Sequence, residues 1–71
     1  MGQDFVKTFG KRIQKLRKEK GISQEKFSIL VGLDRTYISG IETGKRNPSL
    51  FVLKNIADAL DTSLEKLFRG L

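Results

Sequence analysis

Apolar residues recur at spacings of three and four along most of the chain, which is the spacing of amphipathic helices. No stretch alternates apolar and polar residues as a strand would. Capping residues, glycines and one proline divide the chain into five helical segments. Three of them lie at about 4–20, 50–60 and 64–69, and two short ones lie within 23–43. The predicted fold class is therefore all-α, with one domain over 1–71 built as a compact bundle of five short helices.

Each predicted helix has one apolar face, and these faces are expected to meet in a common core. The expected core residues are Phe5, Phe9, Ile13 and Leu16, then Phe27, Leu30 and Val31, then Ile38 and Ile41, then Leu50, Leu53, Ile56, Ala57 and Leu60, and finally Leu64, Leu67 and Phe68. The residues expected to cap the helix starts are Asp4, Ser23, Asp34, Ser49 and Ser63. Those expected to end helices are Gly21, Gly32 and Gly44.

The two short helices within 23–43 are joined by a tight connection. Ser23 and Asp34 are good N-caps, because their side-chain oxygens can accept hydrogen bonds from free backbone N–H groups. Gly32 can adopt the left-handed conformation that ends a helix. A short connection held by a glycine and two caps predicts a helix-turn-helix.

The outward face of the second of these helices is unusual in composition. It carries Arg35, Thr36, Ser39, Gly40 and Thr43, where an ordinary surface helix favours Glu, Lys, Gln and Ala. Glycine in a helix interior costs about 1 kcal/mol relative to alanine. The pattern indicates either a surface of short polar side chains that can approach another molecule closely, or a helix of poor intrinsic stability that the fold tolerates.

Several runs resemble the lambda-repressor-like, Cro/XRE-type helix-turn-helix family of DNA-binding transcription regulators, from about Phe9 to Phe68. The resemblance is carried by Arg17 and by GISQEKFS, VGLDRTYISGIETGKRNPS and LKNIADAL, at 21–28, 31–49 and 53–60. Within them, LDRTYISGIE is similar to the same run of restriction-modification controller proteins. A phage-type repressor or an antitoxin-like autoregulator remains an alternative. The operator, the regulated genes and the sign of regulation stay open.

The resemblance implies a role for individual residues in binding double-stranded DNA. Base-reading residues would be Arg35, Thr36 and Ser39. Phosphate-contacting residues would be Ser23, Gln24, Tyr37, Thr43, Lys45, Arg46 and Asn47. Arg17 would form a structural, partly buried ion pair with Glu42. Glu42 lies at the end of the second short helix within 23–43, which corresponds to the recognition helix of the family.

The charge distribution favours a polyanionic partner. The chain carries a net charge of +6, with eight Lys/Arg against three Asp/Glu in 1–33 and three against three in 47–71. Lysines at 7, 11, 15 and 18 form a like-charge row on the first helix, which nearby phosphates would relieve. The alternative is that these lysines only keep the protein in solution.

Composition also argues against other functions. The chain has no cysteine and no histidine, so thiolate zinc sites and the commonest general base are excluded, and we expect no enzyme, metal or cofactor. No apolar run reaches the length of a membrane span, and no signal peptide is recognisable, so we expect a cytoplasmic, nucleoid-associated protein without a small-molecule ligand. A protein-interaction module on the same fold would present an acidic or apolar face in place of Arg35, Thr36 and Ser39.

We expect a homodimer through the C-terminal part of the chain, because one recognition helix reads only a few base pairs. Two-fold pairing fits a palindromic operator with half-sites about 34–36 Å apart. Phe51 lies off the apolar stripe of its helix, and Phe68 and Leu71 end the chain with apolar surface. These three residues form the expected interface, unless Phe68 only closes the core of the monomer.

Overall fold

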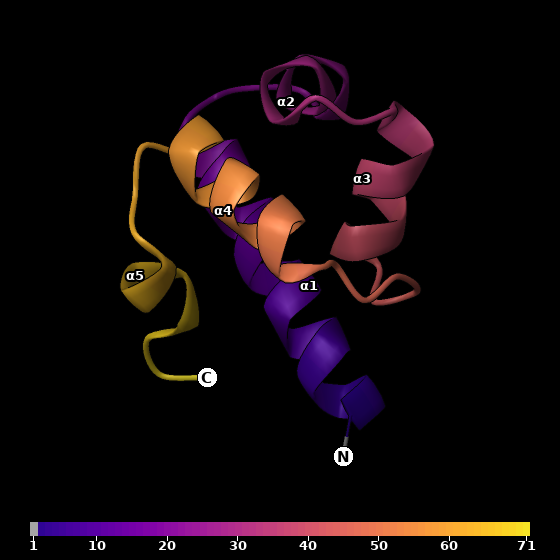
Figure 1. The fold of residues 1–71 in the computed structure, drawn as a ribbon, viewed down its shortest axis with the longest axis vertical. Helices are drawn as coiled ribbons and strands as arrows, with labels where there is room; N and C mark the ends of the chain where they lie inside the picture. Colours follow the sequence, from indigo (N-terminus) through magenta and orange to yellow (C-terminus); the bar gives the residue numbers. More distant parts are fainter. Residues whose placement is uncertain (1) are drawn as a thin grey trace.

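The long first helix, α1 (Gly2–Glu19), runs through the middle of the molecule (Figure 1). The computed structural model describes residues 2–71, and these form four further helices and no strand. They are α2 (Gln24–Val31), α3 (Arg35–Glu42), α4 (Leu50–Ala59) and α5 (Leu64–Phe68). α3 packs against α1 and α2, whereas α4 packs against α2 and α5, and α5 also contacts α1. The predicted all-α bundle of five helices is confirmed, although α1 is longer than the others.

The helix starts follow from local sequence. Ser23, Asp34, Ser49 and Ser63 each accept a hydrogen bond from a backbone N–H in the first turn of the helix that follows. The prediction that Asp4 caps the first helix is wrong, because the helix begins at Gly2 and Asp4 lies within its first turn. A carboxylate there faces the positive end of the helix dipole, so the residue still suits its position.

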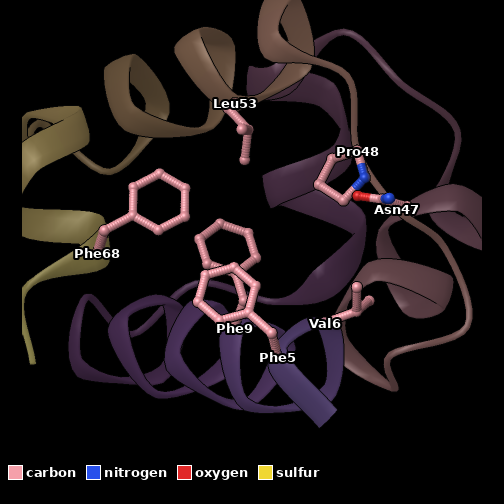
Figure 2. A pocket seen from close by; sticks show the side chains of 7 residues that line it. All are labelled: Phe5, Val6, Phe9, Asn47, Pro48, Leu53 and Phe68. Atoms are coloured by element: carbon pink, nitrogen blue, oxygen red, sulfur yellow. The ribbon is translucent and has the colours of Figure 1, made fainter. Parts of the chain in front are cut away.

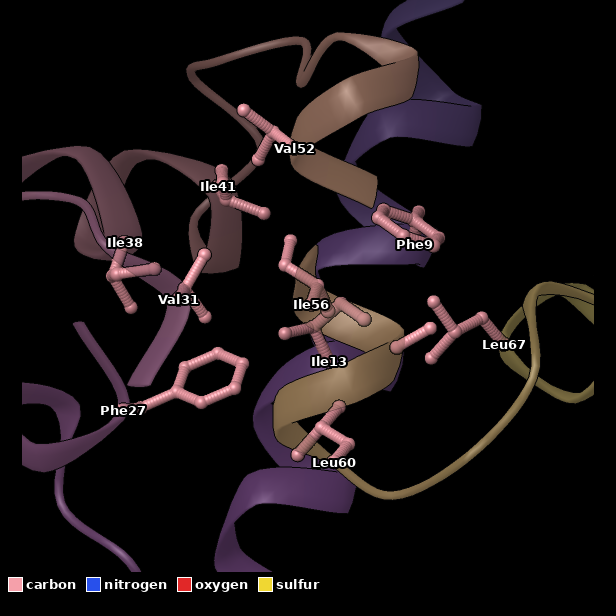
Figure 3. Packing of buried hydrophobic residues seen from close by; sticks show 11 residues of the cluster. Phe9, Ile13, Phe27, Val31, Ile38, Ile41, Val52, Ile56, Leu60 and Leu67 are labelled. Carbon is pink, nitrogen blue, oxygen red and sulfur yellow. The ribbon is translucent and has the colours of Figure 1, made fainter. Parts of the chain in front are cut away.

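Side chains from all five helices meet in one core (Figure 3). The largest buried side chains include Phe27, Ile13, Ile38, Ile56 and Leu67. The full set of buried apolar residues is Phe9, Ile13, Phe27, Val31, Ile38, Ile41, Val52, Ile56, Ala57, Leu60 and Leu67. All but Val52 were expected.

The prediction of a core position is wrong for three residues. Leu50, Leu30 and Phe5 are 74%, 51% and 47% exposed. The buried face of α4 follows Val52, Ile56 and Leu60 at intervals of four, which places Leu50 at the edge of that face in the first turn.

The exposure of Leu30 and Phe5 relates to two other side chains, Ser28 and Phe68. Ser28 takes the buried place on α2 that was expected for Leu30, and its hydroxyl donates to the carbonyl oxygen of Glu25 at 2.6 Å. Leu30 is two positions later, roughly 200° around the helix, so it lies on the outward side when Ser28 is buried. Phe5 lies near the start of α1, where the stacked ring of Phe68 covers it from one side.

α1 and the end of α3 approach each other so closely that only glycine fits between them. A Cβ atom at Gly10 would overlap the carbonyl oxygen of Ile41 and lie 2.8 Å from that of Glu42. Gly44, with φ +77°, would place a Cβ atom 2.8 Å from Cα of Lys7. The orientation of α3 is therefore fixed by backbone packing against α1.

Candidate nucleic-acid interface

The α3 helix has one buried and one accessible face. Ile38, Ile41 and Glu42 are buried, and the carboxylate of Asp34 caps the helix by accepting from the N–H groups of Thr36 and Tyr37 at 2.7 and 3.2 Å. On the opposite face the side chains of Arg35, Thr36 and Thr43 are exposed, and Ser39 and Gly40 are half-buried. The core thus anchors α3 while its short polar side chains stay available to a partner.

A buried ion pair locks the end of α3 to α1. Arg17 Nε lies 2.7 Å from Glu42 Oε2, and Arg17 Nη2 lies 3.0 Å from Glu42 Oε1. Arg17 Nη1 also donates to the carbonyl oxygen of Ile22 at 2.8 Å. The two residues are only 7% and 4% exposed, so the pair that the family resemblance implies is present and more completely buried than expected.

Gln24, the first residue of α2, joins this network. Its Nε2 donates to Glu42 Oε1 at 3.0 Å, which ties the start of α2 to the end of α3. Sequence reasoning missed this bond, and no spacing signals it, because the two residues are 18 positions apart. The primary amide has a second N–H that Glu42 does not use.

The groove on the outward face of α3 brings together half of the predicted DNA-contacting residues. It has a volume of about 460 Å³ and is lined by Thr36, Ser39, Gly40, Thr43, Lys45 and Arg46. The loop carrying the two cations folds back onto α3, because the backbone N–H groups of Lys45 and Arg46 both donate to the carbonyl oxygen of Gly40. Short hydroxyl side chains and two positive charges therefore share one concave surface.

Other predicted contact residues lie outside this groove. Arg35 is exposed at the first turn of α3, and Tyr37 is half-buried with the guanidinium of Arg46 over its ring. Ser23 lies at the start of α2, where its hydroxyl accepts from Lys26 N–H at 3.0 Å. Asn47 lines a different, apolar cavity.

That apolar cavity lies between the start of α1, the loop before α4, and α5 (Figure 2). It has a volume of about 70 Å³. Phe68 stacks on Phe9 at 5.0 Å and on Phe5 at 6.2 Å between ring centroids. Phe68 is thus half-buried in the monomer, whereas Phe51 and Leu71 are exposed.

The part of the chain that the structure describes also bears on metal binding and membrane insertion. No group of three or more His, Cys, Asp or Glu side chains there is arranged to hold a metal ion. None of the described helices is long and apolar enough to cross a membrane.

Comparison with known proteins gives consistent matches to DNA-binding regulators. The profile of the family described as "Helix-turn-helix" matches residues 13–67. The control protein C.MunI of Mycoplasma sp is 52% identical over 69 residues, which cover 96% of this chain and 93% of that protein. The immunity repressor of Bacillus phage phi105 is 40% identical over 53 residues, covering 75% of this chain and 37% of the repressor.

The solved structures extend this similarity to the fold. The crystal structure of the restriction-modification controller protein C.AhdI from Aeromonas hydrophila superposes with a TM-score of 0.87 at 46% identity. The superposition covers 89% of this chain and 91% of C.AhdI. Fold and sequence thus agree on the same group of relatives.

Proposed function

Because this chain belongs to the Cro/XRE-type helix-turn-helix family of DNA-binding transcription regulators, we propose that it is a controller protein that binds a palindromic operator as a homodimer. The observation that carries the proposal is the outward face of α3, where short hydroxyl side chains and two loop cations line one groove. Such a surface suits a major groove, which admits one α-helix and presents phosphates at its edges. A protein with this role would work in the cytoplasm, at the nucleoid.

Arg35 is the proposed principal base-reading residue. It is exposed at the first turn of α3, and the N-terminal residues of a recognition helix are those that reach base edges. Its planar guanidinium can donate two hydrogen bonds to O6 and N7 of guanine, which discriminates against another base by about 1–3 kcal/mol. Thr36 and Ser39 follow on the same face and are short enough to contact neighbouring bases.

The loop and the start of α2 are proposed to position the protein on the DNA backbone. Lys45 and Arg46 supply charge, and Thr43 and Tyr37 supply hydroxyl groups beside them. This division is typical of protein–DNA interfaces, in which phosphate contacts position the protein and base contacts specify the sequence. Asn47 would act only from the rim, since it lines the apolar cavity.

The start of α2 offers a second phosphate-binding point. Free N–H groups at a helix N-terminus favour anions. Gln24 begins this helix, and its second amide N–H can donate to a phosphate while the first remains on Glu42. Ser23, which caps the helix, lies next to it. The buried network would thus orient Gln24 toward the DNA.

The proposed dimer forms through α4 and the C-terminus. Phe51 is 74% exposed, and Leu71 is exposed near the end of α5. Large exposed apolar side chains near a region of zero net charge favour pairing of two copies, because no basic surfaces are brought together. Phe68 would lie at the edge of the interface, since its ring already packs on Phe9. An isologous contact through this surface would give the two-fold symmetry of a palindrome.

Selection of bound sequences from random duplex DNA tests the proposed function. Wild-type protein should select a palindrome, and Arg35→Ala should lose preference at one position in each half-site while it still binds DNA non-specifically. Lys20→Ala is the control, because it removes the same charge from an exposed residue that is assigned to neither the DNA surface nor the dimer interface. Failure of the wild type to enrich any sequence would contradict the proposal, and an unchanged preference in Arg35→Ala would move base reading to another residue.

A further inference from the structure

We infer that Gly40 and Tyr37 are positioning residues that hold the Arg46 side chain against α3, so that Arg46 meets DNA from one fixed direction. The inference rests on the proposed DNA-binding function and gives the helix-interior glycine a role. It concerns contacts between the loop after α3 and the helix itself, which were not anticipated from the sequence.

The first observation is that Gly40 is needed for space. It lies in the middle of α3, where its backbone is helical and its φ is not positive, so no backbone conformation requires glycine. Alanine is the better helix former at an ordinary helix position. A Cβ atom here, however, would lie 2.8 Å from Cγ and 3.2 Å from Cδ of Arg46. The aliphatic part of the Arg46 side chain thus occupies the space that a side chain at position 40 would need.

The second observation is that both ends of Arg46 are held. Its backbone N–H donates to the carbonyl oxygen of Gly40 at 3.0 Å, which fixes the start of the side chain. At the other end the guanidinium carbon lies 4.8 Å from the centre of the Tyr37 ring, within the range of a cation–π interaction. Tyr37 is three residues before Gly40, so the two residues lie on neighbouring turns of one helix face.

Together these contacts lay an exposed arginine along the recognition helix. A free arginine in a loop would lose its rotamer freedom on binding, whereas this side chain is already ordered before DNA arrives. Arg46 lines the same groove as Thr36 and Ser39. Arg46 is therefore held beside the proposed base-reading residues Thr36 and Ser39 before DNA binds.

The expected effect of losing this order is moderate. Ordering one rotamer-rich side chain corresponds to a change of about two- to tenfold in the dissociation constant. Gly40→Ala should therefore weaken operator binding by about two- to tenfold. Its melting temperature should stay unchanged or rise, because only an exposed side chain has to move and alanine favours the helix.

A double-mutant cycle tests the inference, with operator binding measured by fluorescence anisotropy on the sequence selected by the wild type. Gly40→Ala should weaken binding when Arg46 is present and have no effect in an Arg46→Ala background. Tyr37→Leu should bind more weakly than Tyr37→Phe, which keeps the aromatic ring, and this difference should also vanish in Arg46→Ala. Melting temperatures of all variants separate loss of binding from loss of folding.

The outcomes distinguish this inference from the proposed function. If Gly40→Ala loses the same factor with and without Arg46, glycine acts by its own closeness to DNA and the inference is overturned. It is also overturned if Gly40→Ala binds as tightly as the wild type. If the wild type itself binds no duplex, the proposed function fails first and this inference fails with it.

Discussion

Replacing Glu42 by alanine should be among the most destabilising single changes in this protein. The carboxylate accepts two hydrogen bonds from Arg17 and one from Gln24, and both Arg17 and Glu42 are nearly inaccessible to solvent. Glu42→Ala would leave the guanidinium of Arg17 buried with only the carbonyl oxygen of Ile22 as a partner. Stranding a buried charge in this way costs about 3–5 kcal/mol.

The size of this loss matters because the chain is small. At roughly 0.05–0.15 kcal/mol per residue, a 71-residue protein has a total free energy of unfolding of about 4–11 kcal/mol. Glu42→Ala would therefore remove about a quarter or more of the total stability. Replacing the pair together, as Arg17→Met with Glu42→Leu, should cost far less, because no uncompensated charge remains in the core.

Urea unfolding followed by circular dichroism measures the effect, with all variants at one protein concentration so that self-association does not confound the comparison. With a slope of about 1–1.5 kcal/mol per molar urea for so small a chain, the midpoint should fall by at least about 2 M. Asp58→Ala is the control: its carboxylate is equally close to Lys54, at 2.8 Å, but both side chains are about 60% exposed. That change should cost no more than about 0.5 kcal/mol. Similar losses for Glu42→Ala and Asp58→Ala would refute the argument from burial.

Three further predictions concern the loop, the dimer and the contact between helices. Lys45→Ala should lower the slope of log K against log salt by about one unit and weaken binding to all sequences alike; a changed sequence preference would make Lys45 a base reader. Phe51→Glu and Leu71→Glu should each sediment as monomers and lose cooperative binding to a palindrome, and unchanged sedimentation would place the interface elsewhere. Gly10→Ala should lower the free energy of unfolding by about 1–3 kcal/mol in urea titrations, because its Cβ overlaps backbone oxygens of α3; wild-type stability would contradict that close approach.

The number of helices and most of their ends could be predicted from sequence because they depend on neighbouring residues. Ser23, Asp34, Ser49 and Ser63 cap the helices that follow them, and Gly32 has the left-handed backbone with φ +83°. These are interactions over two or three positions, so the local sequence contains all the information that is needed.

Burial was harder to predict where it depends on how deeply a helix face sits in the core. Leu50 and Leu30 have the right angular position for a stripe but lie at its margin, and Val52 and Ser28 are buried instead. Helical periodicity gives the direction of a side chain but not the distance to the next helix. Only tertiary packing determines which side of a broad apolar face is covered.

The same division applies to the candidate site. The outward face of α3 follows from periodicity, and the Arg17–Glu42 pair was implied by the family resemblance. The contact between Arg46 and Tyr37 and the bond from Gln24 to Glu42 depend on the path of a loop and on the docking of two helices. Contacts between side chains that the chain brings together only in three dimensions leave no local signal.

The glycine contact between α1 and α3 separates the residues that position α3 from the residues proposed to select the DNA sequence. Gly10 lets α1 lie directly against main-chain oxygens at the end of α3. Side-chain substitutions on the outward face of α3 do not alter this contact. Arg35 and Thr36, the proposed base-reading residues, contribute nothing to the buried core, so a library that randomises them should change the preferred DNA sequence without destabilising the fold. A retargeted variant that keeps Gly10 inherits the angle at which the recognition helix is presented. If these residues read bases as proposed, changes in target preference can accumulate one side chain at a time while the position of α3 stays the same.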